Sequence, residues 1–529
     1  MNSSKTLLLQ IVIFSIFFSS GSISNPTLAS ADSSEEFVDC LSKESKIPSW
    51  LVHTTSSSSY TSILKSSIRN PKFLNTTASA EPVCIVTPSE TSHIQAAVVC
   101  GRRHGLRVRV RSGGHDYEGL SYRAEDRGER FAVVDLSGMR SVSVDAASGT
   151  AWVQSGATLG ELYHAVWRHD PRLGFQAGVC PTVGVGGHFS GGGFGMLQRK
   201  YGLAVDHVVN ATLVDARGDL LDRDSMGEDL FWAIRGGGGE SFGIVVSWHI
   251  KLAPVPPIVT VFDIVRSPDH GAIDILTKWQ EIAPKLPDDI MVRVIIEPQN
   301  VNFEAMYLGT CDELLPLMHL RFPDLAMNRT DCNEMTWIES IPYIHLGRNA
   351  TVDDILNRTS ISRVNTKNRS DYVRDPIPNH IWKKIFAMSQ QVTKFGEFQM
   401  YMDPYGGKIS SIHESATPFP HREGVLYNIQ YITYWQGEAN GTEALKWSRD
   451  LYEFMEPYVS KNPREAYVNY RDLELGRNKL VDGISSYDSG KAWGKRYFRD
   501  NFERLAKVKA KVDPDDYFRN EQSIPPLLN

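Results

Sequence analysis

The sequence predicts a folded protein of mixed α and β structure in two large parts, and three observations support this. From about residue 83 to residue 252, short β-branched runs alternate with glycine turns and helical stretches. The prolines of PVPP at residues 254–257 interrupt this pattern, and the following residues mix strand-like runs such as 291–298 with amphipathic helical ones such as 311–322. At about 150 residues per domain, a length of 529 residues allows three to four domains or two large ones.

The charge balance excludes one broad class of function. Lysine and arginine number 56 against 62 aspartates and glutamates, which gives a formal net charge of −6. A nucleic-acid-binding protein normally carries a basic excess, so we expect no nucleic-acid partner. Hydrophobic residues at 41% and aromatic residues at 10% indicate a folded globular chain rather than a disordered one.

The N-terminus has the composition of a targeting segment. Residues 7–18, LLLQIVIFSIFF, are nearly all apolar, follow Lys5, and give way to small residues around Ala29. This pattern predicts a secretory signal peptide over residues 1–30. The alternative, a membrane anchor, is disfavoured because the run falls short of the ~20 apolar residues that span a bilayer. We expect a secreted protein of the extracellular space or cell wall, with the vacuole or an endoplasmic-reticulum-derived vesicle as the alternative location.

Secretion would expose the chain to glycosylation and disulfide formation. N-x-S/T sequons occur at Asn75, Asn210, Asn328, Asn349, Asn357, Asn368 and Asn440. The six cysteines show no zinc-binding spacing, and no metal site is expected; their even number allows three disulfides in an oxidising compartment. Cys180 stands apart because it lies in a glycine-rich loop with little room for a partner cysteine.

Three glycine-rich loops carry the strongest signal for a ligand site. In residues 178–195, GVCPTVGVGGHFSGGGFG, eight of 18 residues are glycine, which suits close backbone approach to a planar or phosphorylated ligand. Residues 111–122, RSGGHDYEGLSY, offer successive amides for an anion, and RGGGGE at residues 235–240 precedes a strand. No G-K-S/T and no clean G-x-G-x-x-G follows, so ordinary ATP and NAD cradles are disfavoured. The alternative for each loop is a set of tight turns without a ligand.

These motifs resemble those of plant berberine bridge enzyme-like flavoproteins, within the wider vanillyl-alcohol oxidase class. The resemblance runs from about Cys40 to the C-terminus and also includes FWAIRGGGGESFGI, ESATPFPHR, NYRDLELG and YFRDNFERLAKVKAKVDP, in the family's order. It implies an α+β fold with a two-subdomain FAD-binding domain at residues 31–255. A substrate-binding domain at residues 256–464 would hold an antiparallel sheet over the flavin, and residues 465–529 would return to the FAD-binding domain.

The resemblance also implies that FAD is attached at two points. His115 would link to the flavin 8α carbon and Cys180 to flavin carbon 6, which explains the isolated cysteine. His188 would donate to the pyrimidine edge of the reduced ring. The other expected cofactor-binding residues are Arg111, Ser112, Gly113, Gly114, Gly184, Gly187 and Gly237. The family's disulfide falls on Cys40 and Cys100. The sequence leaves the pairing of three cysteines open and treats them by default as small, buried hydrophobic side chains: Cys84, Cys311 and Cys332.

The acid/base residue is less clear from the resemblance. Tyr117 and Tyr470 fall on active-site tyrosines of the family, and Gln430 stands where alkaloid-cyclising members carry a glutamate. A glutamine cannot abstract a proton, so we expect a tyrosine to be the base, with its pKa lowered from about 10. Members that oxidise monolignols have a tyrosine at Phe194 and a lysine at Asn428, and both are absent here. The alternative for both tyrosines is a packing role.

A small side chain bears on the use of oxygen. In this family the residue three positions after the flavin-linked cysteine guards the oxygen-reacting carbon, and here it is Val183, which implies access for dioxygen. We therefore expect a monomeric oxidase that moves a hydride from a sugar, oligosaccharide or aromatic alcohol to FAD and then forms hydrogen peroxide. The alternatives are an oxidative cyclase of a specialised metabolite and a non-redox cyclase or binding protein that keeps FAD as a scaffold.

Overall fold

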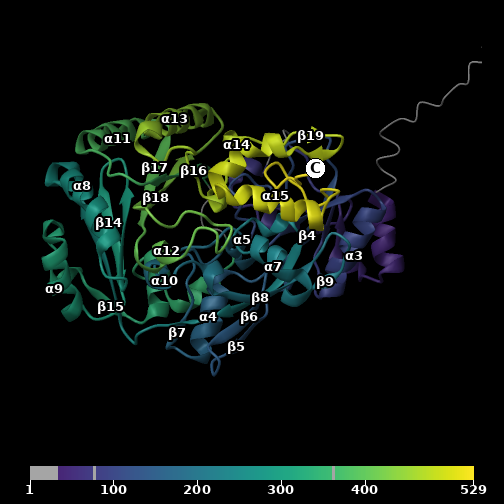
Figure 1. Ribbon diagram of the computed structural model, residues 1–529, viewed down its shortest axis with the longest axis horizontal. Helices are drawn as coiled ribbons and strands as arrows, with labels where there is room; N and C mark the ends of the chain where they lie inside the picture. The colour runs from purple at the N-terminus through teal and green to yellow at the C-terminus, as the bar shows by residue number, and fades with distance from the viewer. Residues whose placement is uncertain (1–33, 75–78, 360–363, 529) are drawn as a thin grey trace, which may run out of the picture.

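The computed structural model describes residues 34–74, 79–359 and 364–528. The predicted signal peptide and the Asn75 sequon lie outside the described residues. Figure 1 shows two groups of elements side by side, a large green sheet with its helices and a second group that includes both the early strands and the yellow C-terminal helices.

The first sheet has four strands in the order β1-β2-β4-β3. Strands β2, β4 and β3 are parallel, and β1 is antiparallel to β2. All five residues of β4 are buried, as expected for a parallel strand covered on both faces. Its alternate residues pack on α2 and on α3. The bounds are β1 Val52–Thr54, α2 Tyr60–Ser66, β2 Cys84–Val86, α3 Thr91–Arg103, β3 Arg107–Arg111 and β4 Phe131–Asp135.

The second sheet has five antiparallel strands in the order β5-β6-β10-β8-β9. The glycine-rich segment 178–195 contains the short helix α5, which lies beside this sheet. The strands of this second sheet and the helices of this part of the chain are β5 Val142–Asp145, β6 Thr150–Gln154, α4 Leu159–His169, α5 Val185–Ser190, α6 Gln198–Tyr201, β8 Val208–Val214, β9 Leu220–Leu221, α7 Arg223–Ile234 and β10 Ile244–Lys251. The small pair β7 (Leu173–Gly174) and β11 (Ala253–Pro254) closes one end.

The third sheet has seven antiparallel strands in the order β15-β12-β14-β13-β17-β18-β16. Side chains alternate between its faces: Met400 and Met402 enter a hydrophobic core, while Tyr401 and Asp403 line a cavity. The strands are β12 Val259–Arg266, β13 Ile290–Ile296, β14 Val301–Tyr307, β15 Asn333–Met335, β16 Asn365–Val373, β17 Gly396–Pro404 and β18 Tyr427–Trp435. The helices of this part are α8 Ala272–Ile282, α9 Cys311–Arg321, α10 Trp337–Leu346, α11 Asn379–Val392, α12 Gly407–Ser411 and α13 Ala439–Met455.

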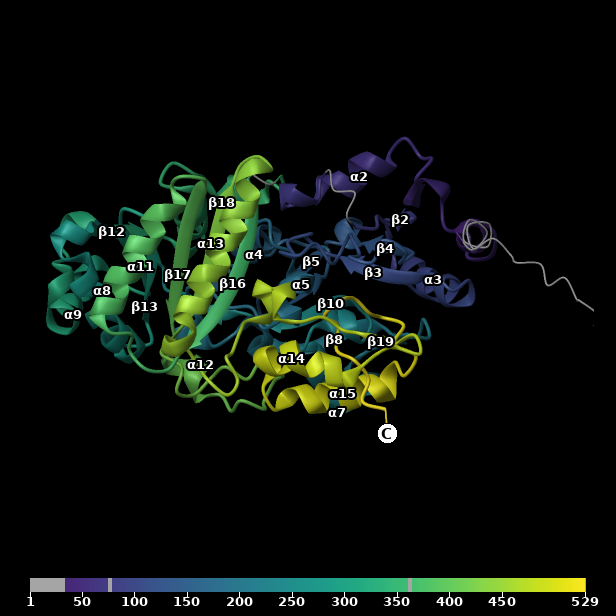
Figure 2. The ribbon, with the colours of Figure 1, turned by 90° about the horizontal axis from the view of Figure 1, so that it is seen from above.

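The C-terminal segment packs against the first part of the chain. After the hairpin β19 (Leu480–Val481) and β20 (Ile484–Ser485), helices α14 (Tyr487–Phe498) and α15 (Asn501–Val512) follow, and α15 contacts α7 (Figure 2). The fully buried Lys509 donates to the carbonyls of Ser241 and Phe518 and to the Asp513 carboxylate, each at 2.7 Å. A buried cation with all three hydrogens bonded fixes the position of this segment.

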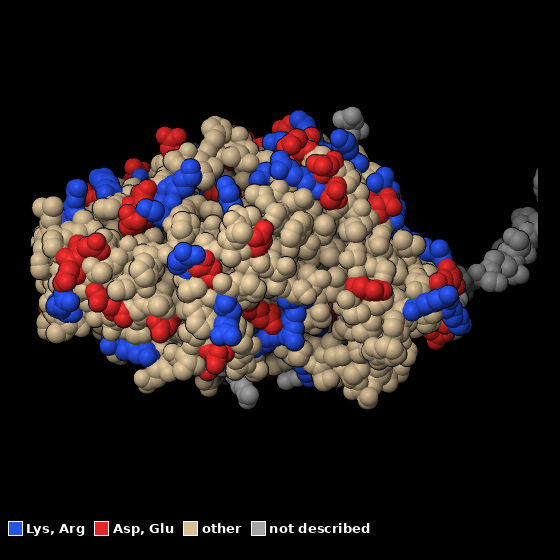
Figure 3. All heavy atoms as spheres, turned by 90° about the horizontal axis from the view of Figure 1, so that it is seen from below, with Lys and Arg blue, Asp and Glu red and all other residues tan. Residues whose placement is uncertain are grey.

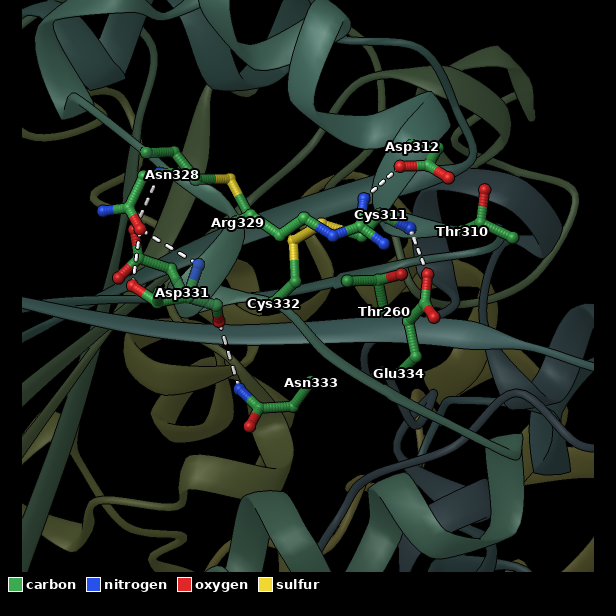
Figure 4. The surroundings of a disulfide bond; sticks show 12 residues. Thr260, Thr310, Cys311, Asp312, Asn328, Arg329, Asp331, Cys332, Asn333 and Glu334 are labelled. Atoms are coloured by element: carbon green, nitrogen blue, oxygen red, sulfur yellow. Dashed lines mark hydrogen bonds and ion pairs between the residues drawn. A yellow bond between two sulfur atoms is a disulfide. The ribbon is translucent and has the colours of Figure 1, made fainter.

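The cysteine predictions are partly right. Cys40 and Cys100 form a disulfide, and Cys84 is a buried free thiol. Cys311 and Cys332, whose pairing the sequence left open, form a second disulfide, so the default role of small hydrophobic side chains is wrong for these two (Figure 4). Helix α9 and the turn after it bring the chain back on itself, so that the two Cα atoms lie 6.0 Å apart, within disulfide range.

The sequons differ in their surroundings. Asn328, Asn349 and Asn357 are exposed. The prediction of a glycan at Asn368 is wrong, because this residue on β16 is only 1% exposed and its side-chain oxygen accepts from Gln430 at 2.9 Å. On the face drawn in Figure 3, positive and negative side chains are interspersed. Within the described part of the chain, no helix has both the length and the hydropathy needed to cross a membrane.

Candidate active site

A cavity of about 560 Å³ lies between the glycine-rich loops and the seven-stranded sheet. Its size is that of a typical small-molecule or cofactor site. Much of the lining comes from four stretches far apart in sequence: the loop after β3, residues 178–195, one face of the sheet, and the turn around Tyr470. The fold therefore brings together most of the residues that the sequence singled out.

The glycines of the two main loops have different roles. A Cβ atom at Gly113 would lie 2.4 Å from the backbone nitrogen of Gly184, so these glycines allow the two loops to touch. A Cβ at Gly187 would meet nothing within 4 Å and would instead enter the cavity. The hydroxyls of Ser121 and Ser155 line the cavity and have no hydrogen-bond partner among the described residues. A bare glycine and unpaired hydroxyls fit a cofactor with a polar chain, such as FAD.

Of the residues expected to bind the cofactor, all but Arg111 and Gly237 line the cavity. The cavity is lined by Ser112, Gly113, Gly114, His115, Cys180, Gly184, Gly187 and His188. Arg111 does not line it, because its guanidinium is fully buried and donates to Asp135 and to carbonyls of α2. Gly237 does not line it either: a Cβ there would lie 2.5 Å from the carbonyl oxygen of Ala233. Gly238 and Glu240 line the wall in its place.

The two predicted attachment residues lie on either side of Thr182. The Thr182 hydroxyl is 3.0 Å from Nε2 of His115 and 3.6 Å from Sγ of Cys180. Burial, with the nearby Arg69 and His345, lowers the pKa of His115 to about 3. The imidazole is therefore neutral at physiological pH. With Nε2 bonded to Thr182, its other nitrogen remains available to form a bond.

A second histidine, which the sequence analysis missed, lies on the same cavity as Cys180. His345 is in the last turn of α10 and lines the cavity. Burial would raise the pKa of Cys180, but interactions with His345 and Thr182 outweigh it and lower that pKa. Conversely, desolvation would lower the pKa of His345, but the interaction with Cys180 raises it. No motif surrounds His345, so only the fold places it on this cavity.

His188 is held in one tautomer. The backbone N–H of Gly178 donates to Nε2 of His188 at 3.1 Å, and burial lowers the pKa of this histidine to about 4. The neutral ring must therefore carry its hydrogen on Nδ1. His188 can donate one hydrogen bond to a ligand in the cavity.

Three of the predicted catalytic residues, Tyr117, Tyr470 and Gln430, line the cavity together. Nε2 of Gln430 donates to the Tyr117 hydroxyl at 3.0 Å and to Asn368 at 2.9 Å. The rings of Tyr117 and Tyr470 lie edge to face with their centroids 6.1 Å apart, and Phe194 packs on Tyr470 at 5.8 Å. Burial raises the pKa of both tyrosines above the usual 10. Neither tyrosine therefore accumulates as the phenolate, so each needs a further group to take its own proton if it is to act as a base.

The further group is Asp403, which the sequence analysis missed. Asp403 on β17 is 5% exposed, lines the cavity, and lies near enough to Tyr470 for its charge to raise that pKa. Burial raises the pKa of Asp403 itself, and the nearby Arg293 opposes this. Arg293 also pairs with Glu304 on β14. The alternation of polar residues in GEFQMYMDP was the available signal, since a polar stripe on one face of a buried strand indicates a lined cavity.

Two further positions singled out from the sequence, Val183 and Asn428, differ in whether they line the cavity. Val183 lines the cavity three residues after Cys180. Asn428 is fully buried and pairs in register with Asp403, and its amide has no hydrogen-bond partner among the described residues. Asn428 is not part of the cavity wall as described, so this position does not supply a base.

Family models, related sequences and solved structures all point to the same relatives of this chain. A family model described as an FAD binding domain matches residues 82–223, and one described as berberine and berberine like matches residues 466–525. The berberine bridge enzyme-like protein Cyn d 4 of Cynodon dactylon is 60% identical over 493 residues, covering 93% of each chain.

Solved structures agree with this relationship. Phl p 4, a grass pollen allergen with glucose dehydrogenase activity, is 56% identical, with a TM-score of 0.90 over 93% of this chain and 100% of that chain. A Phl p 4 variant with isoleucine-to-valine and asparagine-to-histidine substitutions, described as a glucose oxidase, is 57% identical with a TM-score of 0.91 over the same shares. The predicted α+β flavoprotein fold is confirmed, and the chain belongs to the berberine bridge enzyme-like family of FAD-linked oxidoreductases.

Proposed function

We propose that the protein is a secreted sugar oxidase that transfers a hydride from a hydroxyl-bearing carbon, as in glucose, to FAD attached at His115 and Cys180. Dioxygen then takes the electrons and hydrogen peroxide is released. The observation that carries this proposal is the meeting of His115, Cys180, Tyr470 and Asp403 around one cavity. FAD supplies the hydride acceptor when it is bound, and the protein supplies orientation and a path for the proton.

Tyr470 and Asp403 together support the removal of a hydroxyl proton. A tyrosine with a raised pKa cannot accumulate as the phenolate, so it is a poor base alone. It could accept the substrate proton while its own passes toward Asp403, whose charge acts on Tyr470 and which lines the same cavity. Gln430 would then orient Tyr117, whose hydroxyl proton is free to donate to the substrate.

The use of dioxygen is supported by one side chain. A Phl p 4 variant with the isoleucine-to-valine substitution alone is described as a glucose oxidase, whereas the variant with the asparagine-to-histidine substitution alone and the wild type are described as glucose dehydrogenases. In the variant that carries both, the two positions are five residues apart. This chain has Val183 and His188, also five residues apart and both on the cavity wall. We infer that Val183 leaves room for dioxygen at the flavin.

A tetrahydroberberine oxidase of Berberis wilsoniae is 44% identical to this chain, which keeps an alkaloid dehydrogenation as the second candidate. The test is peroxide release in air with glucose, cello-oligosaccharides, an aromatic alcohol and tetrahydroberberine, with oxygen uptake measured in parallel. The proposal predicts peroxide and oxygen uptake in equal amounts with a sugar. Turnover with tetrahydroberberine alone would favour the second candidate, and no turnover with any would favour a non-redox role.

The proposed route is the secretory pathway, with two disulfides and the exposed sequons Asn328, Asn349 and Asn357 as support. Expression in a secreting plant or yeast cell should yield a glycoprotein whose mass falls on deglycosylation and whose sequence begins near residue 30. A protein retained in the cytosol with an intact N-terminus would contradict this part.

A further inference from the structure

Lys367 on β16 is an ammonium group buried between two carboxylates from distant parts of the chain. Its side chain is 5% exposed, and Nζ lies 2.5 Å from the Glu118 carboxylate and 2.7 Å from that of Asp472. Both carboxylates are buried as well. Burial would lower the pKa of Lys367, but the charges of Glu118 and Asp472 outweigh it and raise that pKa. Lys367 is therefore a cation that joins three segments of the chain.

Each of the two carboxylates lies close in sequence to a tyrosine of the cavity. Glu118 directly follows Tyr117, and Asp472 lies two residues after Tyr470. Both tyrosines line the cavity, and their ring centroids are 6.1 Å apart. The Lys367 ammonium thus connects the two backbone segments from which these rings project.

Strand β16 also reaches Tyr117 by a second route. The side chain of Asn368, the residue after Lys367, accepts a hydrogen bond of 2.9 Å from Gln430. Gln430 in turn donates to the Tyr117 hydroxyl at 3.0 Å. The Gln430 bond therefore fixes the hydroxyl end of the tyrosine, while the pair of Lys367 and Glu118 fixes the backbone beside it.

The ion pairs continue from Asp472 to the protein surface. Arg369, two residues further along β16, donates to Asp472 at 2.7 Å and to Glu474 at 2.6 Å. Glu474 then pairs with Arg449 on α13, whose side chain is 50% exposed. Arg449 belongs to the same chain of charges but lies at its outer end, so it provides a matched control.

We propose that Lys367 is a positioning residue for hydride transfer: by holding Glu118 and Asp472 together, it fixes the places of Tyr117 and Tyr470 over the substrate. This inference rests on the proposed function, in which these tyrosines handle the proton of the substrate hydroxyl. The alternative is that the ion pairs serve the stability of the fold alone, because breaking a buried ion pair is destabilising wherever it lies.

The central variant is Lys367→Met, which keeps most of the side-chain length and removes the charge. Glu118 and Asp472 each keep a cation in this variant, because Lys72 lies 3.7 Å from Glu118 and Arg369 still binds Asp472. The variant should therefore fold, and its unfolding midpoint is measured by thermal denaturation. All kinetic comparisons are made well below that midpoint.

Stopped-flow reduction of the holoprotein by glucose under anaerobic conditions gives the limiting rate and the dissociation constant separately. We expect Lys367→Met to lower the limiting rate by about 10-fold to 100-fold, as a misplaced group does, with little change in the dissociation constant. Lys367→Arg keeps the cation and should restore most of the rate. Arg449→Met should match the wild type in rate. A limiting rate that Lys367→Met leaves unchanged would overturn the inference, whatever happens to the unfolding midpoint.

A second measurement needs no substrate. The protein is labelled with fluorotyrosine, and the fluorine resonances of Tyr117 and Tyr470 are assigned from their phenylalanine variants. Lys367→Met should shift both resonances and leave that of Tyr458, on the far side of the sheet, in place. Unshifted resonances would overturn the inference. If no sugar reduces the wild type, the proposed function is wrong, and the resonances alone decide whether Lys367 places the two rings.

Discussion

Gln430 donates a hydrogen bond of 3.0 Å to the hydroxyl oxygen of Tyr117. This bond determines which way the tyrosine points its own hydrogen, because the oxygen accepts from one side and must donate on the other. We therefore infer that Gln430 orients Tyr117 as a hydrogen-bond donor.

Replacing Gln430 by leucine should remove this orientation. The change leaves the Asn368 oxygen without its partner, which costs about 1–3 kcal/mol of stability for a buried group. We expect the rate of flavin reduction to fall about ten-fold, with covalent flavin retained. Stopped-flow reduction under anaerobic conditions measures this, and an unchanged rate would show that the Gln430 bond has no part in catalysis.

Tyr470→Phe and Asp403→Asn should each slow flavin reduction by about 10² to 10⁴-fold, the usual contribution of general-base catalysis. Because the two residues act on one proton, the double variant should be little slower than either single variant. Tyr458→Phe, on the far side of the sheet, is the control. A fully additive double variant would contradict the shared path.

The proposed proton path through Tyr470 and Asp403 predicts that the rate of flavin reduction depends on pH. Burial raises the pKa of Asp403, and a base acts only when ionised. The reduction rate of the wild type should therefore rise as the pH increases through this raised pKa and then level off. Asp403→Asn should lack that rise. A rise that persists in Asp403→Asn would assign it to another group.

Val183→Leu should slow reoxidation of the flavin by dioxygen at least ten-fold, which corresponds to about 1.4 kcal/mol of added barrier. Reduction by sugar should change much less, because Val183 lies on the glycine-rich loop and not on the elements that carry Tyr470 and Asp403, the proposed proton path. Mixing substrate-reduced protein with aerated buffer measures the rate. Equal rates in the two proteins would place the oxygen path elsewhere.

The Cys311–Cys332 disulfide should support the substrate-binding half without affecting attachment of the cofactor. It closes a loop with a sequence separation of 21 residues, and loops of this size contribute about 3 kcal/mol. Replacing both cysteines by alanine should lower the free energy of unfolding by about that amount. Denaturant titration measures the loss, and a loss of FAD in native buffer would contradict the expected separation.

The parts of the site that the sequence predicted are those encoded by local motifs. His115, Cys180 and Gly187 lie in loops whose glycines mark them, and the fold places all three on one cavity. Arg111 and Gly237 stand next to such motifs, but the side chain of one and the Cα of the other face protein instead. A motif predicts the path of the backbone better than the direction of each side chain.

The parts that could not be predicted depend on long-range packing. Asp403 faces the cavity because of the register of β17 and β18, and His345 lies on the cavity only because of where α10 packs. Asn368 matches the N-x-S/T motif, but it lies on a buried strand, where no glycan fits. Each of these depends on contacts between residues far apart in the chain.

The most direct test of the account is an anaerobic titration of the purified protein with glucose, followed by admission of air. We expect one equivalent of glucose to bleach the flavin absorbance, and air to restore it with one molecule of hydrogen peroxide per flavin. The flavin should remain with the protein after acid precipitation. A flavin that glucose and related sugars leave oxidised, or that dissociates fully in acid, would contradict the central claim.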